Sequence, residues 1–335
     1  MLQLMRTLAV LVLLGGLAGC STVGGWFSDD DEDPTAPVAL QDIQESVKVR
    51  RLWSVGIGDG QGEGLYKLQP VLSAGRVYVA SSDGLVRALE QERGKALWKE
   101  DLDIALSGGV GVYDKALFVG SSEGAVVRLD ADSGDVLWST QLRGEVLSPP
   151  QADGKVVVAQ TYDGKLQGLD FGSGEVLWTY DSNLPVLTLR GTSTPVLQDG
   201  VVYAGFANGR VLAFEAGTGD IVWEVRVAIS QGRSEIERIV DIDGSMLLSG
   251  TELYAASYQG RIVAFQAKTG RPMWQEEESS FNDLAEGYGN VYVSSTNSSL
   301  VAYSKRDGAI RWEQSELARR KISAPTSVNR YIAVG

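Results

Sequence analysis

The sequence predicts an all-β protein, an eight-bladed β-propeller built of four-stranded blades, and three observations support this prediction. A glycine is followed four residues later by a tryptophan six times, ending at Trp98, Trp138, Trp178, Trp223, Trp274 and Trp312. Successive tryptophans lie 40, 40, 45, 51 and 38 residues apart, and a period near 40 with several short strands is typical of propeller blades. Each period also contains alternating apolar runs separated by short turn signals.

Each repeat contains two apolar strands joined by a tight turn, followed by an outer strand that carries the tryptophan. In VYVASSDGLVRALE, which ends at Glu90, the two runs flank Asp83-Gly84. The corresponding pairs in the next repeats are Glu123-Gly124, Asp163-Gly164, Asn208-Gly209, Gln259-Gly260 and Asn297-Ser298. Most of these pairs favour positive φ angles, so we expect two-residue primed turns. Large flat rings at repeated positions predict that the tryptophans pack between blades rather than form a ligand cage.

Trp53 precedes the first complete repeat, but RRLWSVGIG around it is similar to the outer-strand phrase VLWSTQLRG. We therefore expect this strand to complete the last blade and close the ring, which would remove exposed strand edges. The sequence stops at RYIAVG, in the second strand of a seventh unit. This pattern predicts a C-terminally truncated chain in which the last repeats, and hence the ring, are incomplete.

The N-terminus predicts a lipoprotein signal peptide over residues 1–19. It carries one charge, Arg6, and an apolar run that is too short to span a bilayer. The run ends in LAGC, and Cys20 is the only cysteine. This ending resembles the lipobox of bacterial lipoproteins, which implies cleavage before Cys20 and lipidation of that residue. Ser21 follows, and by the same resemblance it favours the outer membrane, with the protein facing the periplasm.

Residues 20–45 are predicted to form a lipidated acidic tether between the anchor and a propeller over residues 46–335. Five consecutive acids run from Asp29 to Asp33, and Pro34 and Pro37 follow. Such a segment cannot bury a core and repels itself into an extended state. Consecutive acids also lack the alternating spacing and the glycine of a calcium-binding loop.

Composition excludes several classes of function. The formal charge of −13 gives no basic face for nucleic acid. The chain has no histidine, so Ser-His-Asp and Cys-His nucleophiles and imidazole-based metal sites are absent. We expect no catalytic, cofactor or metal site, and an acidic surface that suits protein partners.

Two connections are longer than the repeat requires. The spacings of 45 and 51 occur in consecutive repeats, and both extra segments follow a tryptophan and precede the next inner strand. Because connections of one type emerge on one face of a propeller, the segments around LPVLTLRGTSTP (184–195) and GRSEIERIVDID (232–243) should be neighbours. Protruding leucines, an arginine and two aspartates there would have the character of a protein-binding patch.

The repeat phrases LDADSGDVLW, FEAGTGDIVW and FQAKTGRPMW resemble the propellers of pyrroloquinoline-quinone (PQQ) dehydrogenases. That resemblance indicates the fold, whereas function depends on a site. A quinone-dependent enzyme, or a remnant of one, is the alternative function. The enzymes of that family use adjacent cysteines against the quinone, and this chain has no such pair.

A second resemblance, to the BamB family of lipoproteins, covers nearly the whole chain. It rests on the lipobox, the acidic tether, the repeats and the two long segments. It implies a non-enzymatic scaffold of the bacterial β-barrel assembly machinery, which binds the periplasmic POTRA domains of BamA to promote folding and insertion of outer-membrane proteins. The partner-binding residues that it implies are Leu187, Leu189 and Arg190 in the first segment and Asp241 and Asp243 in the second. Other lipoproteins of the machinery are further expected partners, and unfolded outer-membrane proteins are a weaker expectation.

The residues themselves allow a second interpretation of this patch. Leu187 and Leu189 alternate, so they could extend an inner strand and pack inward. Asp241 and Asp243 could cap turns or pair with Arg190 within the chain.

Overall fold

The computed structural model describes residues 35–64 and 66–335. The chain divides into two units between Ala39 and Leu40, and all the described strands belong to the second unit, Leu40–Gly335. The predicted signal peptide, Cys20 and the acidic run lie outside the described residues. Residues 35–70, apart from residue 65, form no helix or strand.

The described strands form six four-stranded antiparallel sheets and one two-stranded pair. In chain order they are sheet 1, β1 (Val71–Ser73), β2 (Arg76–Ala80), β3 (Leu85–Glu90) and β4 (Ala96–Asp101); sheet 2, β5 (Leu106–Tyr113), β6 (Ala116–Ser121), β7 (Ala125–Asp130) and β8 (Val136–Gln141); sheet 3, β9 (Gln151–Ala152), β10 (Val156–Gln160), β11 (Lys165–Asp170) and β12 (Val176–Asp181); sheet 4, β13 (Val196–Gln198), β14 (Val201–Gly205), β15 (Arg210–Glu215) and β16 (Ile221–Arg226); sheet 5, β17 (Leu247–Ser249), β18 (Glu252–Ala256), β19 (Gly260–Gln266) and β20 (Arg271–Glu278); sheet 6, β21 (Ala285–Gly287), β22 (Asn290–Ser294), β23 (Leu300–Ser304) and β24 (Ile310–Gln314); and the pair β25 (Thr326–Val328) and β26 (Tyr331–Ala333).

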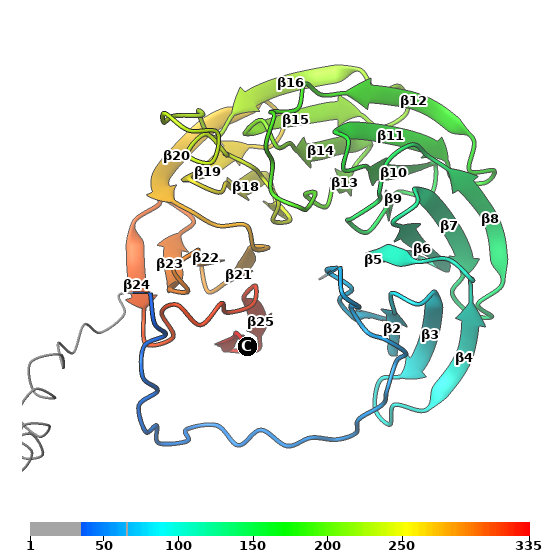
Figure 1. Cartoon of the computed structure of the whole chain (residues 1–335), viewed down its shortest axis with the longest axis horizontal. Coiled ribbons are helices and arrows are strands. Elements are labelled where there is room, and N and C mark those ends of the chain that lie inside the picture. The colour runs from blue at the N-terminus through cyan, green and yellow to red at the C-terminus, as the bar shows by residue number, and fades with distance from the viewer. Residues whose placement is uncertain (1–34, 65) are drawn as a thin grey trace, which may run out of the picture. The chain divides into compact units, whose positions relative to one another are not determined.

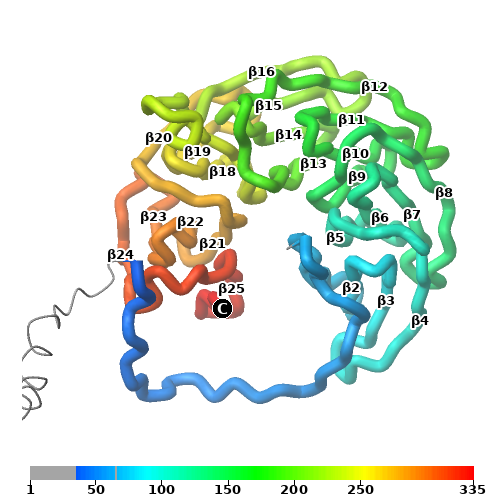
Figure 2. The backbone as a smooth tube through the Cα atoms, in the orientation of Figure 1, coloured from blue at the N-terminus to red at the C-terminus, as the bar shows by residue number. Residues whose placement is uncertain are grey.

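Each sheet is a simple meander in which strands pair in sequence order. The sheets follow one another around a common centre, with β4, β8, β12, β16, β20 and β24 on the outside (Figure 1), and the backbone passes from one sheet to the next without crossing over (Figure 2). The all-β propeller prediction is confirmed. The predicted count of eight blades stays a prediction.

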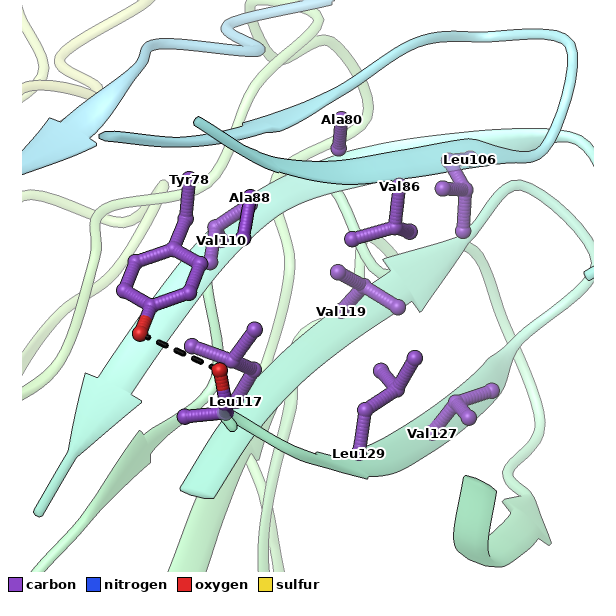
Figure 3. Close-up of a cluster of buried hydrophobic side chains, with 11 residues drawn as sticks. Tyr78, Ala80, Val86, Ala88, Leu106, Val110, Leu117, Val119, Val127 and Leu129 are labelled. Atoms are coloured by element: carbon purple, nitrogen blue, oxygen red, sulfur yellow. Dashed lines mark hydrogen bonds between the residues drawn. The ribbon is translucent and has the colours of Figure 1, made fainter. Parts of the chain in front are cut away.

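The core lies between neighbouring sheets. Figure 3 shows the cluster in which β2 and β3 of sheet 1 pack against β5, β6 and β7 of sheet 2. Val86, Leu106 and Leu117 are fully buried there, and the Tyr78 hydroxyl donates a hydrogen bond of 3.3 Å to the main-chain oxygen of Ala131. Burial of apolar side chains at about 25 cal/mol per Å² makes such inter-sheet clusters the main source of stability.

The tryptophans connect each sheet to the next in the same way. The indole N–H donates to a main-chain oxygen of the following sheet at 2.8–3.0 Å, in the pairs Trp98–Ala131, Trp138–Phe171, Trp178–Ala216, Trp223–Ala267 and Trp274–Lys305. The ring also covers the glycine of the next repeat, so that a Cβ on Gly134 would lie 2.7 Å from Trp98. The predicted role in blade packing is confirmed for these five tryptophans, whereas Trp312 is 41% exposed.

Trp53 makes the same contact although residues 46–57 form no strand. Its indole N–H donates to the main-chain oxygen of Gln91 at 2.9 Å, and a Cβ on Gly94 would lie 2.5 Å from its ring. Trp53 therefore occupies, against sheet 1, the place that each outer-strand tryptophan occupies against the next sheet. That its strand completes the last blade stays a prediction.

The expectation of primed turns is wrong. In the first hairpin, the Gly84 N–H donates to the Ser81 oxygen and the Ser81 N–H donates to the Leu85 oxygen. Only Gly84 has a positive φ, of 99°, while Asp83 does not. This is a type I turn followed by a glycine bulge, a three-residue loop that needs positive φ at one position only. The glycines of the next three hairpins have the same conformation.

Candidate protein-binding surface

The two long connections leave the same face of neighbouring sheets. Residues 182–195 join β12 to β13, and residues 227–246 join β16 to β17; we call them the first and second long loops. Each starts beside the central hairpin of its own sheet, because the Ser182 N–H donates to Gly164 and the Val227 N–H donates to Gly209. The predicted place of both insertions is confirmed.

The two long loops are in direct contact, as the sequence predicts. The Leu189 N–H donates to the Asp241 carboxylate at 3.1 Å, and the Ser193 hydroxyl donates to the main-chain oxygen of Gly244 at 2.9 Å. Gly191 lies so close to the Asp243 carboxylate that a Cβ would come within 2.7 Å of it. The loops thus form one joined surface rather than two independent protrusions.

The leucines of the first long loop differ in exposure. Leu187 is 43% exposed and its neighbour Val186 is 86% exposed, whereas Leu189 is half-buried against the second long loop. Residues 182–195 contain no strand, so the alternative in which both leucines extend an inner strand is wrong. Leu187, Val186 and Leu184, which is 39% exposed, are the large apolar side chains that this loop offers to solvent.

Arg190 pairs with Glu145 and not with the aspartates. The guanidinium lies 3.0 Å from the Glu145 carboxylate, and both side chains are partly exposed. It also lies 5.9 Å from the centre of the Tyr66 ring. Glu145 belongs to the connection between β8 and β9, so the first long loop is tied to the connections on both sides of it.

Asp241 and Asp243 lie beneath the surface that the leucines and Arg190 form. Asp241 is 2% exposed and Asp243 is 5% exposed, because residues 240–244 pass beneath the first long loop. Asp241 instead accepts the Leu189 N–H, which matches the alternative that it satisfies the backbone within the chain. Its side chain holds the first loop in place and is covered by it.

Burial raises the pKa of both carboxyl groups. The pKa of Asp241 rises to about 8 through loss of solvent and repulsion from Asp243, while the hydrogen bond from Leu189 lowers it. The pKa of Asp243 rises to about 6 through loss of solvent, and Lys67 lowers it. One oxygen of Asp243 has no hydrogen-bond partner. Because two buried carboxylates at close range cannot both be ionised cheaply, burial and mutual repulsion favour a protonated form of the pair.

Sequence reasoning missed the apolar side chains of the second long loop. Ile236 is 66% exposed and Ile229 is also exposed. Phe281, in the next connection of the same type, is exposed as well. Large apolar side chains are therefore exposed on three successive connections of this type. The signal in the sequence was the apolar residue inside a polar stretch, RSEIER.

Beside these loops lies a cavity of about 300 Å³, which connections and strands from several sheets line. Lys67, Asp243 and Asp283 are its charged residues. The described residues contain no group of three or more His, Cys, Asp or Glu that could hold a metal ion. With Cys20 as the only cysteine and no adjacent cysteine pair, the chain does not fit the quinone site of the dehydrogenases.

Comparison with known proteins identifies the family. Residues 49–103 and 82–314 match the family model described as outer membrane protein assembly factor BamB. The chain belongs to the BamB family. Members of this family are assembly factors and not enzymes. Within the part of the chain that the structure describes, no helix is long and apolar enough to cross a membrane.

BamB proteins of known sequence and structure match most of the chain. BamB of Pseudomonas aeruginosa is 51% identical over 327 residues, which are 98% of this chain and 84% of that protein. BamB of Kangiella koreensis is 44% identical and covers 98% of this chain and 83% of that protein. The crystal structure of BamB from Moraxella catarrhalis has a TM-score of 0.76 at 34% identity, covering 80% of this chain and 81% of that one.

A europium-containing methanol dehydrogenase shares the fold alone. Its TM-score is 0.67 at 13% identity, over 82% of this chain and 75% of that one. The resemblance of the repeats to quinone-dependent dehydrogenases thus reflects a common propeller architecture, and the membership of the BamB family separates this chain from those enzymes.

Proposed function

We propose that this chain is a non-enzymatic scaffold of the β-barrel assembly machinery, which binds the periplasmic POTRA domains of BamA and so promotes folding and insertion of outer-membrane proteins. The observation that carries the proposal is the joining of the two long loops through Leu189 and Asp241. A partner that meets this face meets a single surface whose parts are fixed relative to one another, and fixed surfaces lose less entropy on binding.

Leu187 and Arg190 have the direct roles in this proposal. Leu187 and the adjacent Val186 supply exposed apolar area, which drives association when water is removed. Arg190 is half exposed in its ion pair with Glu145, so an acidic group of the partner can share the guanidinium. Electrostatic contacts of this kind increase the rate and the specificity of binding.

Leu189, Asp241 and Asp243 have an indirect role. Leu189 is held by its main chain, and the two aspartates are buried beneath the loop. Substitutions at Asp241 or Asp243 would therefore weaken binding by releasing the first long loop, not by removing a contact with the partner.

Anchoring at Cys20 would place the propeller at the periplasmic face of the outer membrane. A lipid anchor on each partner, or a barrel in the same membrane, raises the effective concentration of the two, so that a modest interface suffices. Other lipoproteins of the machinery, and unfolded outer-membrane proteins, are further proposed partners in this setting.

The test is binding of purified BamA periplasmic domains to this chain and to Leu187→Ser, with Leu177→Ser as the matched control. Leu177 has a similar exposure of 48% but lies on the outer strand β12. We expect Leu187→Ser to weaken binding about tenfold, as loss of an apolar anchor does, and Leu177→Ser to leave it unchanged. Equal affinities for all three proteins, with unchanged melting temperatures, would remove this surface from the proposal.

A further inference from the structure

Lys67 connects the start of the first sheet to loops that follow much later in the chain. It lies in residues 66–70, immediately before β1. Its ammonium donates to the main-chain oxygen of Asp243 at 3.4 Å and of Phe281 at 3.2 Å. These partners are 176 and 214 residues away in sequence. One side chain thus contacts two successive connections of the candidate binding face.

Gln69 and Asp283 form a second bridge beside the first. The Gln69 amide lies 3.5 Å from one carboxylate oxygen of Asp283, and the other oxygen accepts the Ser245 N–H at 2.7 Å. Ser245 follows Asp243 by two residues on the second long loop. The segment 66–70 is therefore attached to the loop by both Lys67 and Gln69.

These contacts continue to the surface proposed to bind the partner. Lys67 holds the carbonyl of Asp243, and two residues earlier Asp241 accepts the N–H of Leu189. Leu189 lies between Leu187 and Arg190 on the first long loop. A chain of hydrogen bonds thus leads from Lys67 through the second long loop to the first.

The lysine is suited to this position for two physical reasons. Residues 240–244 form no strand, and although the Asp241 carbonyl accepts the main-chain N–H of Tyr258, the Asp243 carbonyl takes its donor from the Lys67 side chain. An ammonium supplies up to three donors. Its positive charge also lowers the pKa of Asp241 and of Asp243 against the effect of burial. A neutral side chain of equal length would fill the space without either contribution.

We propose that Lys67 is a positioning residue for the partner-binding loops. Its ammonium fixes residues 241–243 of the second long loop, and through Asp241 it fixes Leu189 and the residues on either side of it. The consequence for partner binding rests on the proposed function, whereas the effect on the loops does not depend on it.

The test is hydrogen exchange of the full-length chain, read by mass spectrometry in peptides that cover 187–191 and 239–244. The variants are Lys67→Met, which keeps the aliphatic stem, and Lys67→Arg, which keeps a donor and a charge. Lys305→Met is the matched control, because Lys305 is also half-buried and donates to Ser249 and Glu286 of sheets 5 and 6, away from the long loops.

We expect Lys67→Met to speed exchange in both peptides about tenfold or more, because loss of a charged donor releases local structure. Lys67→Arg should restore most of the protection, and Lys305→Met should leave both peptides unchanged. Unchanged exchange at 239–244 in Lys67→Met would overturn the proposal. A uniform increase in exchange that includes the strands would also overturn it, because Lys67 would then contribute only to global stability.

Binding of BamA periplasmic domains separates this proposal from the proposed function. If exchange rises locally and affinity falls, both are supported. If exchange rises locally while affinity is unchanged, the positioning role of Lys67 stands and the assignment of the binding surface is contradicted.

Discussion

The main-chain N–H of Leu189 donates a hydrogen bond to the carboxylate of Asp241, although the two residues belong to loops that follow different sheets. The bond joins the first long loop to the second. Asp241 is buried by this contact, so the acidic residue supports the surface from below. This contact, the carboxyl pair around it and the sheets that carry it should each respond to mutation or to pH in a measurable way.

Replacing Asp241 by alanine should destabilise the chain by about 1–3 kcal/mol, because the half-buried Leu189 N–H would lose its acceptor. Asp241→Asn keeps an acceptor oxygen and removes a buried carboxyl, so its cost should be smaller. Urea denaturation measures the difference as a shift in midpoint. Equal midpoints for the two variants would show that the hydrogen bond contributes nothing.

Stability around the carboxyl pair should fall as the pH rises. Burial raises the pKa of Asp241 and Asp243 above the usual value near 4, so the folded chain binds more protons than the unfolded chain. The free energy of unfolding then decreases with pH. The stabilisation is complete below the unfolded value, and it is lost as the pH passes the folded values of about 6 for Asp243 and about 8 for Asp241.

The measurement is the melting temperature from about pH 5 to about pH 8, the window in which a raised carboxyl pKa acts through linkage. The double variant Asp241→Asn, Asp243→Asn is the reference, because all other titrating groups are the same in both proteins. The wild type should lose more stability than the variant over this range. Parallel curves would contradict a shared proton in the pair.

Gly134→Ala should destabilise the chain by about 1–3 kcal/mol, because a side chain there must adopt a strained backbone and displace a ring. Gly134 has a φ of 84°, and a Cβ would lie 2.7 Å from Trp98. Gly217→Ala is the control, since Gly217 has no neighbour within 4 Å of an added Cβ and no positive φ. Thermal unfolding of the two variants gives the comparison. Equal melting temperatures would contradict the importance of the packing of Trp98 on Gly134.

Trp138→Ala should cost about 3–5 kcal/mol, as removal of a buried aromatic ring does. Trp138 is buried between sheets 2 and 3 and donates to Phe171. Trp312, on β24, is exposed, and its replacement by alanine should cost less. Chemical denaturation of both variants measures the difference. A larger loss of stability in Trp312→Ala than in Trp138→Ala would contradict the view that these rings stabilise the chain by burial between sheets.

The repeat period and the tryptophan positions were sufficient to predict the sheets, because strand alternation and a fixed spacing are local properties. The turns were not predictable in the same way. Asp-Gly and Asn-Gly suit both a primed two-residue turn and a type I turn with a glycine bulge, and the choice depends on how the strands pair. At Gly84 the hydrogen bonds to Ser81 decide it.

At the candidate site the sequence predicted that the two long loops are neighbours, but it did not predict the burial of Asp241 and Asp243. Aspartates are ordinarily exposed, and only the path of the second loop beneath Leu189 explains the exception. The residues around Lys67 in the sequence did not indicate its contacts. Its partners lie 176 and 214 residues away, and a contact of that range depends on how the sheets are arranged around their common centre.

The bonds from Lys67 to Asp243 and from Leu189 to Asp241 draw on residues from 67 to 243, so the surface cannot assemble from any single repeat. A chain folding from its N-terminus would keep the first long loop loose until sheets 1 to 4 and the whole second loop had come together, because contacts distant in sequence form late. Binding of a partner would then require that most of the propeller has already folded. A chain whose sheets have not yet assembled would not bind the partner at this surface.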